Sequence, residues 1–113
     1  MIIVIMGTIP HKEQRYETQG DWWFDGTPLQ IRADLELPED EQWCTLVHEL
    51  VEAVLCKFKL GDDATKIVDE WDKSHKKSKD PGSLKGCPYK REHEVASVIE
   101  NILRLELNGL RKR

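Results

Sequence analysis

A histidine and two glutamates lie close together in the segment His48-Glu49-x-x-Glu52, and these residue types can bind a divalent metal. On a helix with about 100° per residue, His48 and Glu52 lie about 40° apart on one face, so one cation can reach both. The spacing is that of the two histidines in the zinc motif H-E-x-x-H, with a carboxylate as the second ligand. Glu49 then occupies the position of a general base that deprotonates metal-bound water, so we predict it as the catalytic residue.

A second group of candidate ligands opens the last predicted helix. Glu92 falls inside the apolar arc of this helix, where a carboxylate is costly unless it is paired, hydrogen-bonded or bound to a metal. His93 lies at the edge of the same arc. We therefore expect a zinc site formed by His48, Glu52 and His93, with the fourth position left open for water and with Glu92 as a further candidate ligand.

The sequence leaves the last ligand open. Glu92 or Asp72 could complete the site or orient His93 from behind, and Glu100 lies on nearly the same helical face as His93. The competing interpretation is a buried ion pair of Glu92 with Arg91, Lys90 or His48. Because several carboxylates are available, Mn²⁺ and Mg²⁺ are alternatives to Zn²⁺.

The elements that must position these residues predict an α+β fold in a single domain, 1–113. Apolar or β-prone runs at 2–5, 16–18, 22–24 and 29–32 are separated by turn dipeptides such as Gly20-Asp21 and Asp25-Gly26. This pattern predicts a small antiparallel β meander over about 1–34. Leu29, Ile31 and Ala33 should share its buried face.

Three helices should follow over about 38–108. The first is predicted from Pro38, with acidic residues in its first turn, to Lys59, and should stop at Gly61. The second should start at Asp62 or Asp63 and reach about Ser78, and the third should end at Gly109. The apolar face of the first helix is predicted to comprise Trp43, Leu46, Val47, Leu50, Val51, Val54, Leu55 and Phe58.

Composition limits the classes of partner. The chain has 113 residues and a formal net charge of −4, which argues against nucleic acid despite a lysine-rich stretch between 73 and 91. The apolar run 1–6 is too short for a membrane span and lacks the basic leader of a signal peptide. Cys44 and Cys56 lie too far apart on one helix to form a disulfide, so we expect a reducing, cytoplasmic setting.

Three stretches resemble a family of small, uncharacterised bacteriophage-encoded proteins with HELxEA and PYxxEH motifs. They are His48-Glu49-Leu50-Val51-Glu52-Ala53, Leu55-Cys56-Lys57 and Pro88-Tyr89-Lys90-Arg91-Glu92-His93, and Asp80-Pro81-Gly82 is similar to the loop between the family's helices. The resemblance covers about 16–107 and implies a shared site and a phage or prophage origin. More distantly, the chain looks like a minimal zincin, a metallopeptidase fold, without the second histidine of H-E-x-x-H.

The first functional hypothesis is a metal-dependent hydrolase with zincin-like water activation, acting on a peptide or a small amide. The second is a non-catalytic phage protein that binds a host partner. Its metal site would be structural or vestigial, and Trp22, Trp23 and the lysine-rich loop would form the contact surface. The third is an all-α nucleotide pyrophosphohydrolase, which Glu49-x-x-Glu52 fits but the strand-rich start does not. His11 and His75 have no partner pattern and are predicted to be surface residues.

Overall fold

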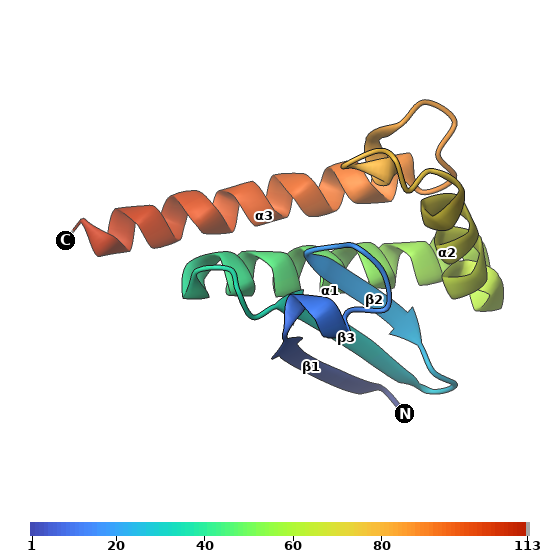
Figure 1. Cartoon of the computed structure of the whole chain (residues 1–113), viewed down its shortest axis with the longest axis horizontal. Helices are drawn as coiled ribbons and strands as arrows, with labels where there is room; N and C mark the ends of the chain where they lie inside the picture. Colours follow the sequence, from blue (N-terminus) through green and yellow to red (C-terminus); the bar gives the residue numbers. More distant parts are fainter. Residues whose placement is uncertain (113) are drawn as a thin grey trace.

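The structure, a computed structural model that describes residues 1–112, has an α+β fold, which confirms the predicted class (Figure 1). A three-stranded sheet forms the N-terminal part, and helices pack against it. The elements in chain order are β1 (Ile3–Ile9), β2 (Gly20–Phe24), β3 (Pro28–Asp34), α1 (Glu39–Leu60), α2 (Ala64–Ser74) and α3 (Lys90–Arg111), with short 3₁₀ turns at 11–13, 61–63 and 81–83.

The strand order is β1-β3-β2, with β3 in the centre. β2 and β3 form the expected antiparallel hairpin, whose turn uses Gly26 at a φ of 66°. β1, however, pairs with β3 in parallel, so the prediction of an antiparallel meander is wrong for this strand. The residues after β1 cross to the other side of β3 and do not turn back, and the predicted strand at 16–18 belongs to this crossing loop.

One face of the sheet is buried against α1. Leu29, Ile31 and Ala33 are each at most 3% exposed, which confirms that they share the buried face. Val4 pairs with Leu29 and Met6 with Ile31, so these β1 side chains point to the same side of the sheet.

Helix α1 is the central layer of the molecule, with the sheet on one side and α3 on the other (Figure 1). It therefore buries two sides. Leu46, Ala53 and Cys56 belong to the hydrophobic core, while His48 and Glu52 are buried on the side that meets α3. The predicted apolar face is only partly buried, because polar side chains take up much of the contact with α3. Its exposed members are Trp43, Val54 and Phe58.

The helix ends differ modestly from the prediction. α1 ends before Gly61, which has a φ of 72° as expected for a glycine stop. α2 ends at Ser74, and α3 continues through Gly109 to Arg111, since one helical glycine costs only about 1 kcal/mol relative to alanine. Among the described residues, none of the helices has the length and apolar composition that crossing a membrane would need.

The contrast between two leucines tests the position of the core. Leu29 is 3% exposed in β3, whereas Leu35 is 50% exposed just after it. We expect Leu29→Ala to lower the free energy of unfolding by about 2–5 kcal/mol, because it removes buried contacts and leaves a cavity. Leu35→Ala should change it by about 0.5 kcal/mol or less. Urea denaturation followed by circular dichroism measures both, and equal losses would contradict this core.

Candidate metal centre

Helices α1 and α3 bring together three atoms that can bind one metal ion. His48 Nε2 lies 3.2 Å from Glu52 Oε2, and His93 Nδ1 lies 2.8 Å from the same oxygen. One ligand atom from each residue lies within 4.8 Å of the other two. The i, i+4 spacing on α1 places the first two, and the packing of α3 along α1 adds the third. The structure thus assembles three of the four predicted ligands.

In each imidazole, the ring nitrogen that faces away from Glu52 lies close to a further carboxylate. Glu100 Oε1 lies 2.8 Å from His48 Nδ1, although no well-aligned hydrogen bond satisfies this buried nitrogen. Asp80 Oδ1 lies 2.8 Å from His93 Nε2. In metal sites the ring nitrogen that does not bind the ion is typically held by a carboxylate, a carbonyl or water, which fixes the orientation of the ring. Both histidines have a carboxylate within ion-pair distance of this nitrogen.

The candidate ligand Glu52 is oriented by the sheet. Trp22, on β2, donates a hydrogen bond from Nε1 to Glu52 Oε1 at 3.0 Å, which leaves the other oxygen toward the histidines. Trp22 is 3% exposed, whereas Trp23 beside it is half-buried under the guanidinium groups of Arg15 and Arg32. The second functional hypothesis placed Trp22 in a contact surface, but this side chain is buried and cannot contact a partner there.

The loop before α3 closes over His93. Gly82 packs so tightly on the imidazole that a Cβ at this position would lie 2.6 Å from a ring carbon. Trp71 on α2 donates a hydrogen bond to the carbonyl of Pro81 at 2.8 Å and holds the loop in place. The Asp80-Pro81-Gly82 segment thus has a structural role. Its glycine permits the close approach, and its aspartate reaches the ring.

The three candidate ligands shift one another's pKa values. Burial lowers the pKa of His48, but the carboxylates of Glu100 and Glu52 outweigh it and raise the pKa to about 10. Burial also opposes the charge on Glu52, yet the two imidazoles lower its pKa to about 2. Burial lowers the pKa of His93 and Glu52 raises it, with a net increase. The carboxylates that attract protons to these rings would equally attract a divalent cation, which releases those protons on binding.

Glu49 lies on the neighbouring side of α1, against the start of β2. A Cβ at Gly20 would lie 2.6 Å from Glu49 Oε1, so the glycine makes room for this carboxyl group. Burial raises the pKa of Glu49 well above its usual value, and the charge of Glu52 adds to this effect. A carboxylate with a raised pKa is a stronger base than an ordinary glutamate, which is the direction that general base catalysis requires.

The structure does not bring Glu92 or Asp72 into the ligand set. Glu92 is buried, but its Oε1 pairs with Lys59 Nζ at 2.9 Å, so the ion-pair interpretation holds for this residue with a partner that the sequence did not suggest. Asp72 accepts hydrogen bonds from the hydroxyl groups of Tyr16 and Tyr89. Burial raises the pKa of Asp72 to about 6.

Sequence reasoning missed a second buried charge beside the centre. Asp21 is 2% exposed and forms two hydrogen bonds with the guanidinium group of Arg15, at 2.8 and 2.9 Å. Arg15 also binds Asp69 on α2 and so ties the loop after β1 to the helices. Arg15 and Asp21 lie in different elements with no helical or strand spacing between them, and Asp69 is far away in the sequence. No local pattern could therefore have indicated this group.

His11 is not the unpaired surface residue that the sequence suggested. Its Nδ1 lies 2.6 Å from Asp34 Oδ2 and its Nε2 lies 2.6 Å from Glu17 Oε1. His75 also has a partner, because its ring stacks on Trp71 with 3.8 Å between centroids. With Glu36, His11 and Asp34 form a second group whose atoms are close enough to share an ion. In the structure, however, both nitrogens of His11 already face carboxylates.

Comparison with known proteins adds no family to this geometry. No protein-family model matches the chain, and searches of curated proteins and of solved structures give no match either. Any function therefore has to be argued from the site itself.

The His11 pairs predict a pH dependence of stability. The carboxylates of Glu17 and Asp34 accept hydrogen bonds from the protonated ring of His11 and raise its pKa above 6.5. A group whose pKa is higher in the folded state stabilises the fold fully below its unfolded pKa, and this contribution is lost as the pH rises through the folded pKa. His11→Gln should therefore cost most stability near pH 5 and progressively less toward about pH 9. Urea denaturation across this range checks it, and a cost that does not change with pH would contradict it.

Proposed function

We propose that the protein is a divalent-metal-dependent hydrolase that holds zinc with His48, Glu52 and His93. The observation that carries this proposal is the convergence of three ligand atoms within 4.8 Å, each on a side chain that another residue contacts from behind. Two imidazoles and a carboxylate are a typical ligand set for zinc in hydrolytic enzymes, and Mn²⁺ is the principal alternative.

The residues around the centre support hydrolysis. Three protein ligands leave a fourth position, where zinc would bind water, lower its pKa and polarise a substrate carbonyl or phosphoryl group. Glu49, the residue after His48 on the flank of α1 toward β2, would take the proton from that water, and its raised pKa makes its carboxylate a stronger base than an ordinary glutamate. His48, Glu52 and His93 would bind the ion and keep the site rigid. A peptide or a small amide is the proposed substrate class, and phage origin and cytoplasmic location stay predictions of the sequence.

The burial of the ligands favours one alternative, a structural metal site in a non-catalytic binding protein. His48 is 8% and Glu52 5% exposed, and structural sites are typically closed to solvent in this way. The all-helical pyrophosphohydrolase is excluded, because the chain contains a three-stranded sheet.

Metal analysis tests the centre directly. Protein purified without added metal, or dialysed against zinc, should hold about one zinc ion per chain by elemental analysis. His48→Ala, Glu52→Gln and His93→Ala should each reduce zinc affinity at least tenfold, because each removes one of three ligands. Glu94→Gln, which alters an exposed carboxyl group on α3 outside the centre, should keep full affinity. Folded wild-type protein that takes up no zinc or manganese would contradict the site.

Substitution of the base separates a catalytic from a structural centre. Glu49→Gln keeps the size of the side chain but cannot accept the proton, so hydrolysis should fall by about 10²–10⁴-fold while zinc content stays unchanged. Glu94→Gln, at an exposed position on α3, should have no effect on either. The measurement is the rate of hydrolysis of peptide and activated-ester substrates by the zinc-loaded protein. Equal rates in wild type and Glu49→Gln would remove Glu49 from the mechanism, and a fully inactive wild type would favour the structural alternative.

A further inference from the structure

Strand β1 is an edge strand with apolar side chains on both of its faces. Ile3, Val4, Ile5 and Met6 are between 37% and 45% exposed, and the sequence has no charged residue before position 12. Edge strands of soluble proteins are usually protected by charges, proline or a bulge, because their free backbone groups can pair with another strand. From Ile3 to Ile9, β1 itself has no charged side chain, proline or bulge, and the nearby charge is that of Arg32 on β3, which donates a hydrogen bond to the carbonyl of Ile5.

Helix α1 adds an apolar stripe on the flank of the molecule that contains β1. Trp43, Val54 and Phe58 fall within about 60° of one another on the helix and are 56%, 42% and 86% exposed. Trp43 lines a hollow of about 270 Å³ together with Met6 at the β1 edge. The opposite flank of α1, at Glu49, contacts Gly20 on β2. The apolar stripe on α1 therefore lies toward the β1 edge of the sheet, and the candidate base Glu49 lies toward the β2 edge.

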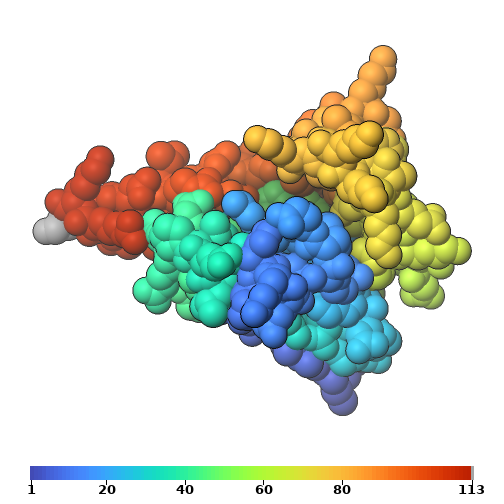
Figure 2. Space-filling model, viewed as in Figure 1, coloured from blue at the N-terminus to red at the C-terminus, as the bar shows by residue number. Residues whose placement is uncertain are grey.

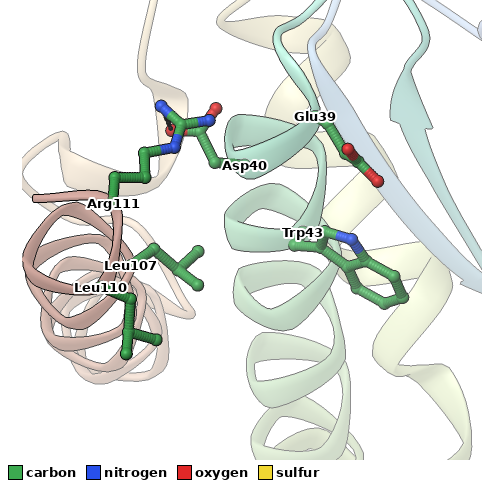
Figure 3. Close-up of a pocket in the computed structure, with 6 residues that line it drawn as sticks. All are labelled: Glu39, Asp40, Trp43, Leu107, Leu110 and Arg111. Atoms are coloured by element: carbon green, nitrogen blue, oxygen red, sulfur yellow. Dashed lines mark ion pairs between the residues drawn. The ribbon is translucent and has the colours of Figure 1, made fainter. Parts of the chain in front are cut away.

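The C-terminal half of α3 extends this apolar surface. Leu110 and Leu107 line a second hollow, of about 340 Å³, with Trp43 and the first turn of α1 (Figure 3). Ile99 and Ile102 lie within about 80° of Leu110 on the same side of α3 and are 38% and 56% exposed. The last turns of α3 project past the start of α1, beyond the body of the molecule (Figure 2).

The accessible surface of the single chain is larger than that of a typical compact monomer of the same mass. The chain has an accessible surface of 7402 Å² at 13.2 kDa. A compact monomer of this mass exposes roughly 6,400 Å². The excess of about 1,000 Å² is similar to the roughly 800 Å² that each partner buries in a standard stable interface.

We propose that two copies of this chain form a two-fold dimer through β1 and the apolar surface around it. A two-fold axis perpendicular to the sheet pairs β1 with its copy in the antiparallel direction, which joins the two sheets into one of six strands. Val4 and Met6 of both copies then lie on the helix-covered face of this sheet, and the stripes of the two α1 helices face each other above them. The centres at His48 lie away from the axis.

A second copy fits this surface better than an unrelated partner because the surface is self-complementary. The uncharged β1 meets an identical strand without repulsion between like charges, and apolar side chains face apolar side chains on both faces of the pair. The exposed stripe on α1 requires an equally apolar covering, which the same stripe of the second copy provides.

Measurement of molar mass by light scattering after size exclusion tests the dimer on the full chain. Wild type should elute at twice the 13.2 kDa of one chain at micromolar concentration. Ile5→Lys at the edge and Ile99→Lys on α3 should each shift the mass to that of one chain, because each places a charge in the interface. Asn108→Lys adds the same charge to α3 at an exposed position more than about 150° from Ile99 and Leu110, so it should stay dimeric.

Both altered residues are solvent-exposed in a single chain, so circular dichroism should show that the lysine variants remain folded. As a second measurement, single cysteines placed at positions 3, 4 and 5 should give a disulfide-linked dimer under oxidation for at least one position. A wild-type monomer at all concentrations up to about 100 μM would overturn the proposal, as would a dimer that survives both lysine substitutions. Loss of zinc binding in His48→Ala without loss of the dimer would separate this inference from the proposed function.

Discussion

The buried carboxylate of Glu52 is the interaction on which the arrangement of the layers depends. It accepts a hydrogen bond from Trp22 in the sheet, contacts His48 on its own helix and reaches His93 on α3. A carboxylate that is 5% exposed is tolerated only when its charge is compensated, so the sheet, α1 and α3 must all lie within reach of one side chain. The packing of the sheet, α1 and α3 in three layers therefore depends on the charge of Glu52.

The two flanks of α1 have opposite characters, and this follows from its central position. One side of the helix packs on the sheet and the other on α3, which leaves two flanks between these layers. Glu49 lies on the flank toward β2, close to the ordered polar network around Asp21 and Asp72. Trp43 lies on the flank toward β1, where the surface is apolar. A single helix thus separates a polar centre suited to chemistry from an apolar surface suited to association.

The sequence predicted what depends on local spacing. The i, i+4 relation placed His48 and Glu52 on one face, and alternation in β3 identified Leu29 and Ile31 as core residues. Its failures involve contacts between distant segments. An apolar run such as β1 carries no information on whether its partner is parallel or antiparallel, and the pairing of Glu92 with Lys59 depends on the angle at which α3 crosses α1. The roles of Trp22, Asp80 and Glu100 became visible only when the ligands had positions in space, because the partners of a ligand follow no fixed spacing.

The hydrogen bond from Trp22 to Glu52 has a consequence for observation of the protein in solution. An indole whose N–H faces a buried carboxylate experiences a strong local electric field, and that field changes whenever the charge around the carboxylate changes. The emission of Trp22, one of four tryptophans in the chain, should therefore respond to the charge of Glu52. Through Trp22, the sheet both orients the carboxylate of Glu52 and provides an intrinsic fluorescent probe of its ionisation.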